Sequence, residues 1–558
     1  MRRSAFVLLA LLAGFAVPAT AQPVPALEGA LFVGDDTDAG DFLGSCAAAA
    51  VVPDAAPEAG LPPAGPLALG GAPGTFPPQA AYLFTRSGGE WMQADRLDAD
   101  AAGFLGVACA LSADGTLAVV GAPVRVAPPA SGMYNGAAHV FRYDASTGAW
   151  TQEAALRVAD LEDSRFFGQA VAVARDGTGT AATEERIITL GGGRAWVLRR
   201  SNAPDAVWVE EARFEPEPGD TFQGLTVDGA RPHQRASIVH GTDGVWRAMA
   251  GGPYSGGSPF RGAAYLWRLD ESPGAPGGGA WVQEARFLGG NGACLGHAVA
   301  LAEVGGVWLA AAGATEGCLG GGVGAGYVRV WRLEGEPGEV GTWVQEAELT
   351  LPPGEEGLEQ FGYGVALSTG PGGKAVLVAS AFLRGGATAP PLGAFVFTRS
   401  EGTEPTWRAV AKLSTVTAAS PFGSGWAVGV SGSLAVVGHP EEDTAGADAG
   451  AVFAFDLAGV LTAAEDAPGV SPVGLAVSVA PNPARGRAVV RFTLAEAGPV
   501  RVAVMDVLGR RARSVDLGVR GAGAHTAALD LGGLAPGLYL VRVHTGTATG
   551  AARMVLMR

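Results

Sequence analysis

The sequence predicts an all-β chain in which a repeated four-strand unit is followed by a smaller, separate β-sandwich. Short apolar runs alternate with turns throughout the 558 residues, which include 87 Gly and 37 Pro. One residue pattern recurs at intervals of 55 to 73 residues over most of the chain. The charge balance then changes sign near residue 475. Repeats with periods of this order are typical of propellers and solenoids, and a charge asymmetry marks a domain boundary.

Each repeat opens with Phe and Gly, or a close variant, directly before a first apolar strand. The openings are Phe42-Leu43-Gly44, Phe104-Leu105-Gly106, Phe167-Gly168, Phe222-Gln223-Gly224, Leu295-Gly296, Phe361-Gly362 and Phe422-Gly423. A second strand ends in small residues or Pro, as in Gly71-Ala72-Pro73, and a third carries aromatic residues, as in Ala81-Tyr82-Leu83-Phe84. Gly and Pro at these positions predict sharp turns where backbones approach closely.

The fourth strand is the most regular part of the repeat, because a Trp precedes a Leu or Phe by six residues in six copies. The pairs are Trp91 and Leu97, Trp150 and Leu156, Trp208 and Phe214, Trp281 and Phe287, Trp343 and Leu349, and Trp407 and Leu413. An even spacing places both residues on one face of a strand. The regularity favours packing between repeats over carbohydrate stacking for the Trp side chains.

Four strands in each of seven repeats predict a seven-bladed β-propeller over residues 22–456, a fold whose radial repetition protects sheet edges. No Trp strand follows Phe455, yet an apolar segment, Ala26 to Val33, precedes the first repeat. We expect this segment to complete the last blade and to close the ring.

The repeats resemble the bacterial FG-GAP family of propeller repeats, in which a Gly-Ala-Pro turn is combined with a W-x-Q-E-A-x-L strand. Residues 150–156 read WTQEAAL. The integrin-like branch of that family carries calcium loops between its first two strands. The corresponding hairpins here, at residues 112–115, 174–177 and 430–433, have too few carboxylates for the resemblance to imply calcium at these positions.

The N-terminal residues 1–21 have the features of a cleavable secretory signal. Arg2 and Arg3 precede an apolar run from Ala5 to Val17, and the small-residue site Ala19-Thr20-Ala21 follows. No later run is long enough for a membrane-spanning helix. The sequence therefore predicts export of a chain without a transmembrane segment.

The C-terminal region differs from the repeats in charge. Residues 22–475 have a net charge of -25, whereas residues 476–558 have 11 Arg against four acidic residues, a net charge of +7. Residues 457–474 show little strand pattern and are predicted to be a linker. Short alternating runs in residues 475–558 predict a small Ig-like β-sandwich.

This region resembles the C-terminal sorting domain of the type IX secretion system, type A. The residues that match its motifs are Pro481, Asn482, Pro483, Asp506, Gly509, Pro536, Gly537, Tyr539 and Arg558. The resemblance implies that the domain directs passage across the outer membrane through the secretion machinery and is then removed. The propeller would be released or anchored at the surface. An ordinary β-sandwich binding module is the alternative.

Two candidate sites involve cysteine and aspartate. In an oxidising compartment, Cys294 and Cys318 are predicted to form a disulfide within one repeat. Cys46 and Cys109 are predicted to be small buried thiols, and a disulfide between them is the alternative. The cluster Asp36, Asp38 and Asp41 is a candidate calcium site, with a solvated turn as the alternative. The sequence predicts no cofactor other than this candidate calcium ion.

No signature of a metalloprotease, serine hydrolase or phosphate-binding loop occurs in the sequence. The acidic net charge of -16 argues against a nucleic-acid partner. We therefore expect a non-enzymatic binding or adhesion module for a glycan or protein ligand. The alternative is an extracellular hydrolase or lyase acting on polysaccharide or protein, which needs two acidic residues from different blades near the central axis.

Overall fold

The structure is a computed structural model that divides into two compact units, residues 1–461 and residues 462–558. The predicted signal, residues 1–21, lies outside the described residues. The structure describes residues 24, 26–54, 61–74, 79–100, 102–125, 136–158, 165–176, 183–201, 207–222, 234–256, 260–271, 279–315, 326–335, 341–352, 355, 360–381, 393–402, 405–417, 426–463, 477–494, 498–506, 511–521, 523–535, 537–545 and 549–557.

The described residues of the first unit form seven sheets of four or five strands, named sheets 1 to 7 in chain order, and a two-stranded pair, β7 (Ala102–Gly103) with β10 (Val124–Arg125). The first strands of sheets 1 to 7 are β3 (Cys46–Val52), β8 (Ala108–Leu111), β13 (Ala170–Arg175), β17 (Ala236–His240), β21 (Leu295–Val304), β25 (Val365–Thr369) and β29 (Val428–Ser431). The second strands are β4 (Gly65–Ala72), β9 (Leu117–Ala122), β14 (Glu185–Gly191), β18 (Trp246–Gly252), β22 (Val307–Ala314), β26 (Ala375–Ala381) and β30 (Leu434–His439).

The third strands are β5 (Ala80–Ser87), β11 (Ala137–Asp144), β15 (Arg194–Arg200), β19 (Ala263–Asp270), β23 (Tyr327–Glu334), β27 (Gly393–Arg399) and β31 (Ala451–Asp456). Sheets 1 to 6 have the fourth strands β6 (Glu90–Leu97), β12 (Ala149–Leu156), β16 (Trp208–Phe214), β20 (Ala280–Leu288), β24 (Thr342–Leu349) and β28 (Trp407–Ser414). Each sheet is an antiparallel meander of these strands.

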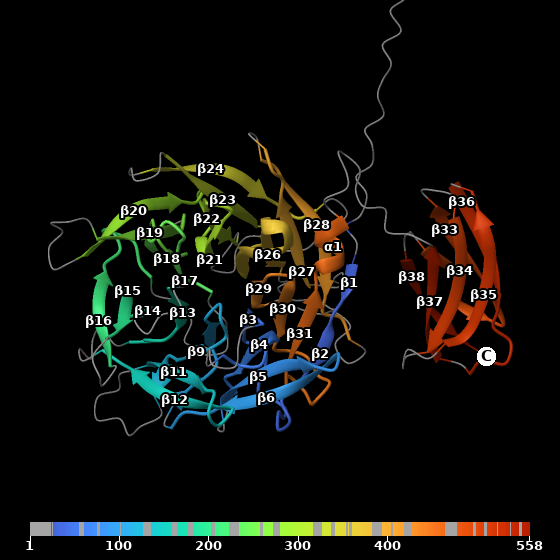
Figure 1. Ribbon diagram of the computed structural model, residues 1–558, viewed down its shortest axis with the longest axis horizontal. Coiled ribbons are helices and arrows are strands. Elements are labelled where there is room, and N and C mark those ends of the chain that lie inside the picture. Colours follow the sequence, from blue (N-terminus) through green and yellow to red (C-terminus); the bar gives the residue numbers. More distant parts are fainter. Residues whose placement is uncertain are drawn as a thin grey trace, which may run out of the picture. The chain divides into compact units, whose positions relative to one another are not determined.

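The sheets surround an axis, with the first strands innermost and the fourth strands outermost (Figure 1). Each first strand contacts the first strand of the next sheet, and β29 contacts β3. The described first strands therefore form a closed ring, as a propeller requires.

The N-terminal segment divides between two sheets. β2 (Ala30–Phe32) pairs antiparallel with β31 and is the outer strand of sheet 7, with Leu31 opposite Phe453. The prediction that all of Ala26 to Val33 joins the last blade is wrong for its first part, because β1 (Ala26–Glu28) pairs parallel with β28 of sheet 6. The change of sheet occurs at Gly29, where a Cβ atom would lie 2.8 Å from the Phe455 ring.

The Phe-Gly opening and the Gly-Ala-Pro turn are in contact with each other. Gly44, with φ +92°, donates its N–H to the carbonyl of Gly71 in the same sheet at 2.9 Å. A Cβ atom on Gly71 would lie 2.0 Å from the carbonyl oxygen of Gly106 in the next sheet. The same close approach joins sheet 7 to sheet 1, through Gly438 and Gly44. The two glycine positions of the repeat therefore set how closely neighbouring sheets can pack.

The fourth strands contain a β-bulge that the even spacing did not predict. In sheet 4, Leu266 pairs with Ala285 and Trp267 pairs with Gln283, so that Glu284 is the extra residue. A bulge shifts the alternation of side chains by one residue. Phe287 therefore stacks on Trp331 of sheet 5, at 4.1 Å between ring centroids, whereas Trp281 contacts Phe214 of sheet 3 at 5.9 Å.

The prediction that both residues of each pair share one face is therefore wrong, although their predicted packing between repeats is found. Sheet 7 has no Trp strand of its own, and Phe32 of β2 supplies the missing contact by stacking on Trp91 at 5.1 Å.

The first unit ends in a short helix, α1 (Ala458–Ala463), and a single 3-10 turn, η3 (Pro371–Gly373), precedes β26. Leu457 and Leu461 are buried. The predicted linker, 457–474, is therefore wrong at its start, because two leucines at helical spacing anchor this segment to the first unit. Residues 464–474 lie outside the described residues.

The second unit has the strands β32 (Val477–Arg485), β33 (Arg487–Leu494), β34 (Gly498–Asp506), β35 (Arg511–Arg520), β36 (Gly523–Asp530), β37 (Gly537–Thr545) and β38 (Thr549–Leu556), in the sheet order β35-β34-β37-β38-β32-β33-β36. β32 pairs antiparallel with β33 through Val477 to Ala480 and parallel with β38 at Ala484. Strands from both sides of this junction fill one core, which includes Phe492 and Val541.

A disulfide joins Cys46 of β3 to Cys109 of β8, across neighbouring sheets, with 5.7 Å between their Cα atoms. The prediction of two buried thiols is wrong, because the ring places equivalent positions of adjacent first strands side by side. The two cysteines are separated by 63 residues, one repeat period, and both follow a Phe-Leu-Gly opening. That shared position was the available signal.

Candidate functional site: the axial cavity

A cavity of about 430 Å³ lies at the axis of the first unit and is lined by the first strands of all seven sheets. This volume falls within the range of small-molecule sites. The wall consists mainly of Ala and Val, together with a few Leu and Ile residues. Bulky side chains would not fit where seven strands converge, and this explains the run Cys46-Ala47-Ala48-Ala49 in β3.

A glutamine side chain crosses the cavity at the end where the first strands begin. The carboxamide of Gln234, which precedes β17, donates to the Val428 carbonyl and accepts from the Val428 N–H at 3.2 Å. Val428 begins β29, three sheets away along the chain. The Gln234 backbone carbonyl also accepts from the Val299 N–H at 2.8 Å. Among the described residues, this brace obstructs one end of the cavity.

The other end of the cavity carries its charged groups, where the first strands end. Asp114 accepts hydrogen bonds from the Ser112 hydroxyl at 2.6 Å and from the Thr116 hydroxyl at 2.9 Å, and its second oxygen pairs with Arg175. Burial acts to raise the pKa of Asp114, but the hydrogen bonds and the Arg175 charge outweigh it and lower the pKa. Asp114 is therefore an ionised carboxylate with both oxygens engaged.

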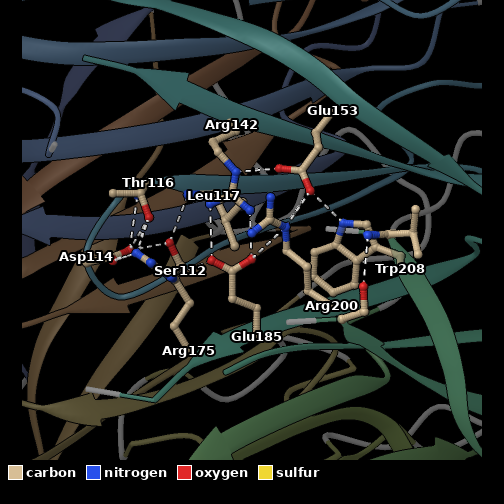
Figure 2. Close-up of polar contacts among 12 residues, drawn as sticks. Ser112, Asp114, Thr116, Leu117, Arg142, Glu153, Arg175, Glu185, Arg200 and Trp208 are labelled. Atoms are coloured by element: carbon tan, nitrogen blue, oxygen red, sulfur yellow. Dashed lines mark hydrogen bonds and ion pairs between the residues drawn. The ribbon is translucent and has the colours of Figure 1, made fainter. Parts of the chain in front are cut away.

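Figure 2 shows that this ion pair continues into the interface between sheets 2 and 3. Arg175 also pairs with Glu185 at 3.0 Å, and Glu185, only 2% exposed, accepts from both terminal nitrogens of Arg142 at 3.1 and 2.7 Å. Arg142 pairs in turn with Glu153, which also accepts from Arg200 at 2.9 Å. The network extends from the cavity mouth towards the outer strands.

The outer end of this network is a repeated Trp-to-Glu hydrogen bond that the sequence analysis missed. In sheets 2 to 5, the residue three positions after the Trp is a Glu; it is the bulged residue and accepts from the indole N–H of the next sheet. The pairs are Trp208 to Glu153 at 2.9 Å, Trp281 to Glu211 at 3.0 Å, Trp343 to Glu284 at 3.2 Å and Trp407 to Glu346 at 2.7 Å. We name this set the Trp-Glu clamp.

Arginine side chains neutralise the charge of the clamp glutamates. Glu346, whose side chain is 1% exposed, accepts from Arg399 of sheet 6 at 2.7 and 2.8 Å. Burial acts to raise the pKa of Glu346, but hydrogen bonds from Arg399 and Trp407 lower it. The repeated Trp-x-x-Glu spacing was the signal for this clamp, but the face to which Glu points depends on the bulge.

The predicted calcium residues lie in one loop but are engaged separately. Asp36 accepts from the Tyr82 hydroxyl at 2.8 Å and pairs with Arg96 at 3.4 Å. Asp41 accepts from the backbone N–H of Asp38 at 2.7 Å. Within the described ranges, no group of three or more His, Cys, Asp or Glu side chains is placed to hold a metal ion. The donor set therefore does not fit a calcium site.

The other predicted site residues are only partly described. Cys294 is disulfide-bonded, and Cys318 lies outside the described residues, so the Cys294–Cys318 pair stays a prediction.

In the sorting motif, Pro481, Asn482 and Pro483 lie in β32, where its pairing changes from β33 to β38, and Asp506 ends β34 opposite Tyr539. Tyr539 is buried and donates to the Ala535 carbonyl at 2.8 Å, and Gly537 begins β37. Gly509, Pro536 and Arg558 lie outside the described residues.

Comparisons with known proteins give a family match for the second unit. Residues 478–557 match the family model of the secretion system C-terminal sorting domain. No curated protein matches the chain. Among solved structures, the chain is similar to PorZ, a surface component of the type-IX secretion system of Porphyromonas gingivalis, with 12% identity and a TM-score of 0.37 over 88% of this chain; it spans 58% of PorZ.

Two further solved structures have similar scores. The periplasmic gluconolactonase PpgL of Pseudomonas aeruginosa has 13% identity and a TM-score of 0.38, with coverage of 81% of this chain and 94% of that chain. Sqt1 of Saccharomyces cerevisiae has 11% identity and a TM-score of 0.41, with coverage of 84% and 96%.

Among the described residues, no helix is both long enough and apolar enough to cross a membrane. The family match spans nearly all of the second unit, including β32 and the buried Tyr539. The second unit is a secretion system C-terminal sorting domain, and the chain that carries it is exported to the cell surface or outer membrane.

Proposed function

We propose that the protein is an exported, non-catalytic binding module whose ligand enters the axial cavity, and that the sorting domain is removed after it has delivered the propeller. We further propose that the seven sheets are the complete set of blades of an FG-GAP-type propeller. The contacts between the Phe-Gly opening and the Gly-Ala-Pro turn support this assignment, because both glycine positions are used in sheet packing.

One observation favours a binding role over a hydrolytic role for the cavity. Within the part of the chain that the structure describes, the carboxylates that line the cavity are Asp114 and Asp176, from neighbouring sheets. A general acid in a hydrolase needs a raised pKa and an oxygen that can reach the substrate. Asp114 has a lowered pKa, and both of its oxygens are already bonded.

The two carboxylates are also what supports the alternative, a hydrolase or lyase at the propeller mouth. The experiment compares the full-length exported chain with its Asp114→Asn and Asp176→Asn variants on a polysaccharide and protein substrate panel, together with a glycan array. We expect array or protein binding and no turnover. Turnover by the parent chain that either variant abolishes would establish the alternative.

A further inference from the structure

The first strands leave a row of backbone groups facing the cavity. β29 pairs with β30 on one side, and its other edge faces the axis. The Val428 N–H and C=O point to that axial edge, because Gln234 bonds both of them. Backbone groups of an antiparallel edge strand alternate in direction, so those of Val430, two residues further on, point the same way.

Gln234 already shows what this edge recognises. Its side chain is a primary amide, and it binds one edge residue through a paired donor and acceptor. A residue of an extended peptide would present a donor and an acceptor to Val430 in the same way, through its own backbone N–H and C=O. Addition of an extended peptide to a sheet edge is a known mode of recognition that uses these main-chain bonds.

The dimensions and chemistry of the cavity restrict the ligand further. Each first strand contributes a stretch such as Val299 to Leu301 or Val428 to Ser431, which is the length of a three- or four-residue peptide. Among the described residues that line the cavity there is no Trp, Tyr or Phe, and these residues therefore offer no Trp, Tyr or Phe platform for a sugar ring. Arg175 is paired with Asp114 and Glu185, so it is not a free site for an anion.

We propose that the axial cavity binds a short extended peptide segment with small side chains, which enters at the Asp114–Arg175 end and pairs with the Val430 edge of β29. This inference rests on the proposed binding role and names its ligand class. The brace at Gln234 limits the depth of entry, and the Ala-rich wall excludes large side chains.

The test uses acetyl-(Ala)4-amide as the probe and its backbone N-methylated form as a matched control, titrated calorimetrically into the full-length protein. We expect saturable binding of the first peptide and binding about tenfold weaker for the second, which lacks donors. Equal binding of both peptides, or no saturable binding of the first, would overturn the proposal.

Two variants locate the contact. Val430→Pro removes the N–H that faces the cavity and keeps the β29–β30 ladder, because proline is tolerated at an unpaired strand edge. Val430→Ala is its control and retains that N–H. We expect about tenfold weaker binding for the first variant and little change for the second. Equal affinities would contradict the assigned edge.

The N-methylated peptide tests the same contact without a variant, so a folding defect of Val430→Pro does not decide the result. Failure of the peptide with retained glycan-array or protein binding overturns this inference alone. Failure of every ligand overturns the proposed function as well.

Discussion

The inner and outer strands of each sheet belong to the same meander but have opposite chemistry. The inner strands are rich in Ala and Val, and one edge of β29 faces the cavity. The outer strands of sheets 2 to 5 each carry a Trp and a Glu of the Trp-Glu clamp, which joins neighbouring sheets. Polar side chains therefore join the sheets at the circumference, whereas mainly small apolar side chains surround a cavity at the axis.

The largest expected effect comes from removing an outer strand. Deletion of residues 22–33 removes β2, exposes the edge of β31 and takes away the Phe32–Trp91 contact. Truncating one buried aromatic residue costs about 3 to 5 kcal/mol, so the deletion should cost at least this much in free energy of unfolding. Scanning calorimetry of the two chains measures it. Melting of the truncated chain at the parent temperature would contradict ring closure by this strand.

A second prediction concerns the loss of one Glu of the Trp-Glu clamp. Glu346→Ala leaves Arg399 and Trp407 without their acceptor and removes one of the two carboxylates that pair with Arg332. Loss of one partner of a buried ion pair costs about 3 to 5 kcal/mol. Glu348→Ala is the control, because its pair with Arg329 is exposed and contributes about 1 kcal/mol or less. Urea unfolding of both variants gives the difference. Similar losses would show that the clamp adds no stability.

A third prediction concerns the inner strands. The Cys46–Cys109 disulfide closes a loop of 63 residues, so replacing both cysteines by Ala should lower the free energy of unfolding by about 2 to 4 kcal/mol. The disulfide joins sheets 1 and 2, so its loss should loosen the contact between β3 and β8. Urea unfolding of the parent and the double variant measures the loss. Unchanged stability would mean that packing alone holds these inner strands.

The smallest effect concerns pH and a buried histidine of a third strand. Burial lowers the pKa of His139 to about 4, below its ordinary value of 6.5. The unfolded chain therefore binds more protons between pH 6.5 and 4, and the stability that His139 contributes at neutral pH is lost as the pH falls through this window.

The loss amounts to up to about 3 kcal/mol. His139→Phe reproduces the Ala-Phe-Val-Phe run of sheet 6, residues 394–397, and should remove this pH dependence while His439, with a pKa of about 4, retains its own. Unfolding midpoints from pH 7 to pH 4 measure the difference. Parallel curves for the parent and the variant would contradict the assignment.

Much of the fold was predictable, because the signals repeat. The Phe-Gly openings and the Trp strands located the strands of each sheet, and the missing Trp after Phe455 indicated that an N-terminal strand joins sheet 7. The strand faces on which Trp281 and Phe287 lie were not predictable from their spacing, because one bulged residue reverses the alternation of side chains along the strand. The repeat period places Cys46 and Cys109 at equivalent positions, but the choice between two thiols and a disulfide depends on how closely the first strands of sheets 1 and 2 approach.

The repeat, the two units and the sorting domain can be recognised in the amino-acid sequence, because each depends on patterns that recur or on motifs that are contiguous in the chain. The residues that meet at the axis are known only from the folded structure. The bond between Gln234 and Val428 spans 194 residues, and the mouth joins Asp114 to Arg175 across two sheets. Ring closure creates these contacts, and no local pattern encodes a distance across the ring.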